Sequence, residues 1–430
     1  MGKLAIAVEN AHLDPAATAA IESPPVIVLN LFHSGLGIVR QLSGSGVRVV
    51  GLSAHRRIYG NFTRLCEVRF APNSQEQPEQ LADFLLRTAS DLRGAIIFPT
   101  RDADVLFLDR FRSELEPYYR LAISPRQVLF RVMDKAALAD VALAAGIPVP
   151  RTTVVSEGAQ LQRAAETVGF PCVVKPVSSV EWRQGKNWDA VGGRKAFRAN
   201  NSAQLQQAYD RVSRAHSEIL LQEWIPGQTD QIVVWGGYVC HGSEPLAHFT
   251  ARKIVQSPQE FGTGCVVESA HIPGLLEPSL RLCRALAYEG MAEIEYKRDL
   301  RDGTFKLIEI NARHWDWHEL GGASRMNLTW VAYCHLTGRP IQPSRPVIQR
   351  AKWIAEDAFL TYVLAGFCRG EFGPLEVWRQ LAGQRMYSIF CRSDPLPFLR
   401  YTSATLFPAL AGTAVKKILN GILKRGLVKT

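Results

Sequence analysis

The stretch that decides the fold runs from Phe305 to Arg313 and reads Phe-Lys-Leu-Ile-Glu-Ile-Asn-Ala-Arg. Its apolar and polar residues alternate as far as Asn311, as in a β-strand, so Glu309 and Asn311 project from the same face. Two residues of strand rise separate them by roughly 6.6 Å, which is close enough to share bound cations. Glu295 stands upstream in Ala-Glu-Ile-Glu-Tyr-Lys and is a third candidate ligand.

The three candidate ligands Glu295, Glu309 and Asn311 offer only oxygen atoms. Such a set suits Mg²⁺, with Mn²⁺ as an alternative, better than it suits zinc. Arg313 follows the strand and carries a permanent positive charge suited to a developing phosphate or carboxylate charge. The competing interpretation is an exposed strand end whose charges are solvated.

A geometric condition follows from placing Glu295 and Glu309 on neighbouring antiparallel strands. A two-residue turn at 302–303 would pair Glu295 with Ile310 and misplace the carboxylate. We therefore expect either a loop of odd length, such as residues 301–303, or a β-bulge.

Length and composition limit the class of protein. At 430 residues the chain is too long for one core and predicts two to four subdomains. A hydrophobic content of 47% with 21% charged residues is typical of a folded enzyme. The net charge of +10 favours anionic ligands, but Lys and Arg are spread without the basic stripe of a nucleic-acid site. Residues 1–23 lack a signal pattern and no apolar run reaches membrane-spanning length, so we expect a cytoplasmic protein.

The first part of the chain alternates strands and helices, which predicts a doubly wound α/β unit over residues 24–125. The expected strands include Val26–Leu31, Val47–Leu52 and Ala95–Phe98. Gly35 and Gly37 begin a dinucleotide fingerprint, but Arg40 stands where its third glycine would be. The sequence also lacks a phosphate-binding P-loop. A nucleotide would therefore need a different cradle.

Two later segments carry candidate nucleotide-binding groups. Lys175 leaves an apolar strand, where a charged amine needs an anionic partner, either a nucleotide phosphate or an internal carboxylate. The strand from Ile219 stops at Pro226-Gly227, where backbone groups could bind an adenine edge and Asp230 could hold ribose. Residues 178–194, rich in Ser, Gly and Trp, predict either a lid over phosphates or a surface loop.

The order of these segments resembles that of the ATP-grasp superfamily. The matching segments are Asp134-Lys135, Val174-Lys175-Pro176, Gln222-Glu223-Trp224-Ile225-Pro226-Gly227, Glu295-Tyr296-Lys297 and Glu309-Ile310-Asn311-Ala312-Arg313. The resemblance covers roughly residues 25–335 and points to the carboxylate–amine ligases, such as D-aspartate ligase, and to the ATP-grasp units of carbamoyl-phosphate synthetase. It implies an α/β ATP-grasp fold behind an N-terminal Rossmann-like domain.

The resemblance also implies roles for single residues. ATP would be contacted by Lys135, Lys175, Lys253, Gln222, Glu223, Trp224, Ile225 and Asp230, and Mg²⁺ by Glu295, Glu309 and Asn311. Arg313, with Lys175 and Arg252, would act on the transferred phosphoryl group. His314 and His318, four residues apart, could suggest zinc, but we favour a substrate-facing wall over residues 314–318.

The expected organisation has five parts: a flexible N-terminus at 1–23, a Rossmann-like domain at 24–125, a small lid subdomain with its linker at 126–218, a large subdomain at 219–340 and a mainly helical extension at 341–430. The expected reaction joins a small carboxylic acid, for example an amino acid, to an amine through an acyl-phosphate. Alternatives are a phosphotransferase, a ligase with a non-amine acceptor, and a silent ATP-binding protein. Residues 405–427 predict an amphipathic helix, for which docking or homodimerisation is favoured over contact with an anionic membrane.

Overall fold

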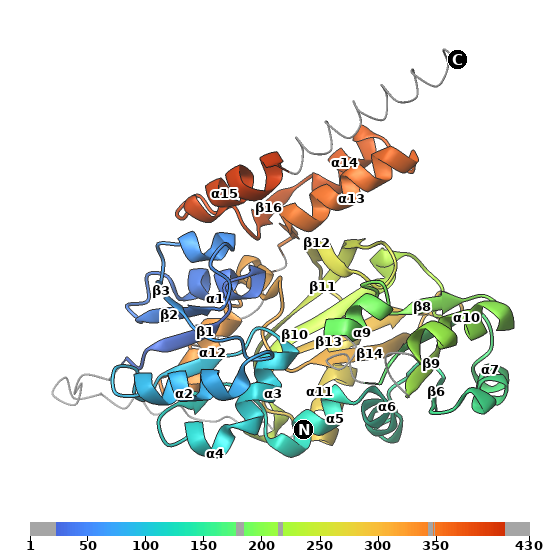
Figure 1. Ribbon diagram of the computed structural model, residues 1–430, viewed down its shortest axis with the longest axis horizontal. Coiled ribbons are helices and arrows are strands. Elements are labelled where there is room, and N and C mark those ends of the chain that lie inside the picture. The colour runs from blue at the N-terminus through green and yellow to red at the C-terminus, as the bar shows by residue number, and fades with distance from the viewer. Residues whose placement is uncertain (1–22, 178–184, 214–217, 343–346, 348, 409–430) are drawn as a thin grey trace, which may run out of the picture.

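The structure is a computed structural model that describes residues 23–177, 185–213, 218–342, 347 and 349–408. The N-terminus expected to be flexible, part of the expected lid and most of the last predicted helix lie outside the described residues. The described chain contains three β-sheets with helices around them (Figure 1). None of its helices within the described ranges is long and apolar enough to cross a membrane.

The N-terminal sheet is parallel, with the order β3-β2-β1-β4-β5, which confirms the α/β prediction for this region. Its strands are β1 (Val26–Leu29), β2 (Val49–Ser53), β3 (Glu67–Phe70), β4 (Ile96–Phe98) and β5 (Arg120–Leu121). Its helices are α1 (His33–Leu42), α2 (Pro78–Thr88), α3 (Asp102–Arg110), α4 (Arg112–Leu115) and α5 (Arg126–Met133), with a 3₁₀ turn at Tyr59–Phe62. The apolar strands β1, β2 and β4 are wholly buried, as expected of parallel strands covered on both faces.

The small sheet is antiparallel, with the order β6-β9-β7-β8. It consists of β6 (Thr152–Val155), β7 (Cys172–Pro176), β8 (Phe197–Ala199) and β9 (Ile219–Glu223), and α6 (Lys135–Ala144) leads into it. Its other helices are α7 (Leu161–Val168), α9 (Gly185–Ala190) and α10 (Ser202–Val212), with a 3₁₀ turn at Gly158–Gln160. A separate hydrophobic core, drawn only from residues 155–221, holds these elements together.

The large sheet has the order β14-β13-β10-β11-β12-β15-β16. Its strands are β10 (Ile232–Val239), β11 (Pro245–Ser257), β12 (Thr263–Ser269), β13 (Gly290–Arg298), β14 (Phe305–Asn311), β15 (Ala351–Ile354) and β16 (Gln384–Tyr387). Its helices are α11 (Leu276–Leu286), α12 (Leu328–Thr337), α13 (Glu356–Arg369), α14 (Pro374–Leu381) and α15 (Leu396–Tyr401). Short helical turns occupy Thr229–Gln231, His241–Ser243, Pro273–Leu275, His318–Ser324 and Thr402–Leu406.

Within the described residues the C-terminal extension is mainly helical, with α13, α14 and α15, and it also contains two strands. Strand β15 pairs with β12 and then with β16, so the extension adds two strands to the large sheet. Edge pairing with β12 gives β15 backbone partners that a local pattern does not reveal. Arg40 of α1 donates to the carbonyl oxygens of Ser388 at 2.8 Å and Ile389 at 2.7 Å, which fastens the extension to the N-terminal sheet.

Candidate active site

Strands β13 and β14 bring the candidate metal ligands onto one face. Glu295 lies directly opposite Glu309, and Glu293 lies opposite Asn311. Residues directly opposite on antiparallel strands project from the same face. The register shifts after Glu295 and leaves Ile308 without a partner, so the expected bulge is confirmed. The odd-length loop was wrong, because residues 299–304 connect the strands.

A cavity of about 990 Å³ lies where the three sheets meet. Of the residues singled out from the sequence, it is lined by Lys135, Lys175, Gln222, Glu223, Trp224, Ile225, Asp230, Lys253, Glu295, Glu309, Asn311 and Arg313. Residues more than 170 positions apart in the chain therefore share one space, as the order of the segments implied.

Arg252 was expected at the transferred phosphoryl group, but it does not line the cavity, whereas its neighbour Lys253 does. Successive side chains of a strand point to opposite faces, and Arg252 makes an ion pair with Glu268 at 3.0 Å. A role for Arg252 at the phosphoryl group is therefore not supported by its position.

Two buried lysines lie near the carboxylates: Lys175 on β7 of the small sheet, and Lys253 on β11 of the large sheet. Lys175 is 8% exposed, and its Nζ donates to Gln222 Oε1 at 2.8 Å. Burial, together with the charge of Lys135, lowers the pKa of Lys175 to about 7. Lys253 is 7% exposed and donates to Glu295 Oε2. Burial opposes its charge, but Glu295 and Glu293 together raise the pKa of Lys253.

The pKa of Glu309 is set by these cations. Burial favours the neutral carboxyl, but Lys135, Lys253 and Lys175 outweigh it and lower the pKa of Glu309. An ionised carboxylate in a dry site needs such compensation. The face of β13 and β14 therefore holds negative charge in the midst of lysines.

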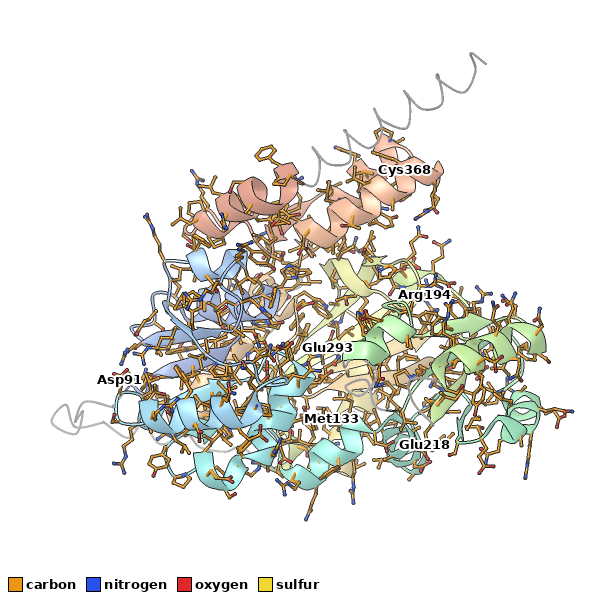
Figure 2. All side chains as sticks on the ribbon, viewed as in Figure 1. Asp91, Met133, Arg194, Glu218, Glu293 and Cys368 are labelled. Carbon is orange, nitrogen blue, oxygen red and sulfur yellow. The ribbon has the colours of Figure 1, made fainter. Side chains whose placement is uncertain are left out.

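Two acidic residues of the site were missed from the sequence. Glu293 is 5% exposed, accepts from Asn311 Nδ2 at 2.9 Å and lies near the centre of the molecule (Figure 2). Burial raises its pKa to about 8. Its two-residue spacing from Glu295 was a usable signal. Asp102 of α3 accepts from Arg313 Nε at 2.7 Å, and nothing local in the sequence connects these two residues.

The side chains of Glu295, Glu309 and Asn311 are the candidate ligands for a bound cation. No group of three or more His, Cys, Asp or Glu side chains is arranged to hold a metal among the residues that the structure describes. The face instead offers two carboxylates and one amide, all with oxygen donors, a set that fits Mg²⁺ when phosphates and water complete the shell. His314 bonds to Thr329 and His318 to the Trp315 carbonyl, so the zinc alternative gains no support.

At the end of β9, where we expected backbone groups to bind an adenine edge, one of the two N–H groups is already occupied. The Glu223 N–H donates to the Arg151 carbonyl at 2.8 Å and is therefore occupied. Its carboxylate is held by Arg301 at 2.5 Å. Ile225 is buried, and its N–H finds no acceptor in the described part of the chain. The backbone N–H of Ile225 is thus the available donor at this edge.

The chain was compared with known proteins. No protein-family model matches it. It is 27% identical to a D-alanine–D-alanine ligase of Pseudomonas putida (strain GB-1) over 183 residues, which are 42% of this chain and 54% of that protein. The chain thus spans about half the length of that relative. It is 22% identical to the D-aspartate ligase of Enterococcus faecium (strain Aus0004) over 264 residues, 59% of this chain and 62% of that one.

Two solved structures share the architecture. An N5-carboxyaminoimidazole ribonucleotide synthetase in complex with ADP superposes with a TM-score of 0.57 at 14% identity, over 76% of this chain and 80% of that one. A biotin carboxylase from Campylobacter jejuni superposes with a TM-score of 0.59 at 15% identity, over 75% and 73%. The structural likeness establishes the fold.

Proposed function

We propose that this chain, a member of the ATP-grasp superfamily, joins a carboxylic acid to an amine with ATP as the energy source. The observation that carries the proposal is the face of Glu295, Glu309 and Asn311, which shares one cavity with buried lysines and with Arg313. The named relatives include ligases that form bonds between amino acids, which supports the same class of reaction. The acid and the amine are left open by these comparisons.

ATP would lie between the small and large sheets. Lys135 and Lys175 line the cavity on the side of the small sheet, where their charges would meet the phosphates. Ile225 N–H would donate to the adenine edge, and Trp224 and Asp230 line the same end of the cavity. The buried Lys175 is largely neutral above pH 7, because its pKa is about 7, and an adjacent phosphate would favour its charged form.

Glu295, Glu309 and Asn311 would hold Mg²⁺. The metal would supply neutralisation of the phosphate oxygens as charge moves between them. Lys253 forms an ion pair with Glu295 and so orients its carboxylate. Arg313 is held by Asp102 at 2.7 Å and by Asn311 Oδ1 at 3.2 Å, so its guanidinium is fixed beside the carboxylates.

The reaction needs two steps that balance without a protein nucleophile. A carboxylate oxygen of the acid attacks the γ-phosphorus of ATP, the bond to the β-phosphate oxygen breaks, and ADP leaves. The neutral amine nitrogen then attacks the carbonyl carbon of the acyl-phosphate, phosphate leaves as the C–N bond forms, and the proton that the nitrogen loses passes to solvent. Lys135, Lys175 and Arg313 would lower both barriers by opposing the negative charge that spreads in each transition state.

A phosphate-release screen tests this function. The purified chain is incubated with ATP, Mg²⁺ and pairs of carboxylic acids and amines, and release should require both partners. Glu309→Gln should reduce the rate by about 100-fold or more, because a fixed charge at the reacting phosphate is lost. Glu244→Gln, at an exposed carboxylate outside the cavity, is the matched control. Release that needs only one partner would favour a phosphotransferase, and ATP binding without turnover would favour a silent binding protein.

A further inference from the structure

Lysines line one part of the cavity and are absent from another. Five lysines line the part between the small and large sheets: Lys135, Lys175, Lys195, Lys253 and Lys297. A second part, which we call the extension wall, consists of Asp316, Tyr362, Glu371, Phe372, Glu376 and Gln380. The extension wall contains three carboxylates and no cation. Helices α13 and α14 and the loop between them supply all of it except Asp316. The two helices lie above β11 and β12 in the view of Figure 1, and α13 packs against both strands.

Asp316 supplies a carboxylate at the end of the wall near Arg313. Ser34 of α1 donates to its Oδ1 at 2.8 Å, which fixes its position. His33, which precedes Ser34 in α1, pairs with Asp357 of α13 at 3.1 Å. No Lys or Arg lies within ion-pair distance of Asp316 among the residues that the structure describes, and the charges of His33 and Arg313 act on it from farther away. The carboxylate therefore faces the cavity with a hydroxyl as its only hydrogen-bond donor there.

Gln380 gives an independent sign of a ligand. It lines the cavity and is 8% exposed. Its Nε2 donates to the Tyr362 hydroxyl at 3.2 Å and to Glu376 Oε1 at 3.4 Å. Its amide oxygen has no donor. A buried acceptor without a partner is costly, and a ligand that satisfies it must carry an N–H or O–H donor.

The wall also contains aromatic side chains and two glutamates. Tyr362 stacks with Phe372 and with Phe359, with ring centroids 4.9 Å and 6.0 Å apart, so other rings engage its faces. Glu371 is already held by Arg369 and by Gln259 at 3.0 Å. Glu376 is exposed and has its nearest cation, Arg379, at 3.9 Å. Glu376 is therefore the carboxylate most available to a ligand.

We propose that the extension wall binds the amine substrate through positive charge, so that the chain prefers amines with a second ammonium group, such as diamines and basic amino acids. The inference rests on the proposed ligase function. An attacking nitrogen must give up its proton to react, so a single amine cannot keep its charge through the reaction. A second ammonium group stays charged and would remain bound at Glu376.

The positive net charge of the chain argues against a general attraction of cations to its surface. With +10 overall, the protein repels small cations on average. Binding of a diamine would therefore require a local site, and general attraction to the surface would not explain it.

Calorimetry with three matched amines tests the proposal. The probes are 1,4-diaminobutane, 1-aminobutane and 4-aminobutanoate, which share a four-carbon spacing and differ in the distal group. They are titrated at constant ionic strength into the full chain, with and without Mg²⁺ and a non-hydrolysable ATP analogue. The diamine should bind at least tenfold more tightly than 1-aminobutane, and 4-aminobutanoate should bind most weakly.

Two variants and one control assign the binding to the wall. Asp316→Asn and Glu376→Gln should each weaken diamine binding by about tenfold and leave the affinity for the ATP analogue within twofold. Glu244→Gln should change neither. Equal binding of 4-aminobutanoate and diamine, or diamine binding unaffected by both wall variants, would overturn the proposal. Absence of nucleotide binding would contradict the ligase function instead, and the titrations without nucleotide would still test the wall.

Discussion

The lysine-lined part of the cavity and the extension wall hold their charges in different ways. Lys175 and Lys253 are buried, and their pKa values shift in opposite directions because only Lys253 has a carboxylate in contact. Glu371 and Glu376 of the extension wall are exposed. Buried charges depend on one another, so a change at one alters stability as well as binding. Exposed charges are screened by water, and they can select a ligand with little effect on folding.

The largest expected effect comes from removing a buried cation. Lys253→Met would leave Glu295 and Glu293 without their nearest positive charge, and it should lower the free energy of unfolding by about 3–5 kcal/mol. Denaturant unfolding of the purified variant measures this, and the phosphate-release rate should fall as well.

The adjacent residue supplies the matched control for this prediction. Arg252 pairs with Glu268 outside the cavity, and its side chain is 40% exposed. Arg252→Met should therefore cost only about 0–1 kcal/mol. Equal losses in the free energy of unfolding for Lys253→Met and Arg252→Met would contradict the prediction that the buried charge matters more than the exposed one.

The attachment of the extension should depend on pH through His33. Burial favours the neutral ring, but Asp357, with help from Asp316 and Glu356, raises the pKa of His33 to about 9. Because this pKa lies above the value of about 6.5 in the unfolded chain, the stabilisation is complete below pH 6.5. It is lost as the pH rises through 9, and amounts to about 3 kcal/mol.

Unfolding midpoints at pH 6 and pH 9.5 check this dependence. The native chain should lose more stability between the two pH values than His33→Gln does, and His271→Gln, at an exposed histidine, should behave like the native chain. The same loss in the native chain and in His33→Gln would show that His33 does not fasten the extension.

The sequence predicted the part of the site that is encoded locally. The strand alternation around Glu309 and the need for a bulge opposite Glu295 follow from the period of a strand, and both appear in the register. Asp102 and the part of the extension wall that follows residue 341 could not be predicted in this way. They meet the cavity only because sheets that are distant in sequence pack together, and no local pattern encodes such packing.

Other features depend on tertiary pairing. Arg252 and Lys253 are equally basic, and only the register of β11 decides which one faces the cavity. The strands β15 and β16 of the extension form along the edge of β12, which no local pattern reveals.

The smallest predicted effect concerns the proton balance of the lysine-lined part. With a pKa of about 7, Lys175 is mostly neutral in the free chain at pH 8. Phosphates would favour its charged form, so binding of the Mg²⁺-loaded ATP analogue at pH 8 should take up close to one proton. Its dissociation constant should rise by up to about tenfold per pH unit above pH 7, since one proton is linked to binding.

Calorimetry in two buffers of different ionisation enthalpy measures that proton. Lys175→Arg is the matched variant, because a guanidinium stays charged throughout this pH range. It should bind the analogue without proton uptake and with a flatter pH dependence. The extension wall differs, because two of its three carboxylates, Glu371 and Glu376, are exposed, and a diamine carries its own charge. If Lys175→Arg took up as many protons as the native chain, the titrating group would lie elsewhere, and the contrast between the two parts of the cavity would lose its electrostatic basis.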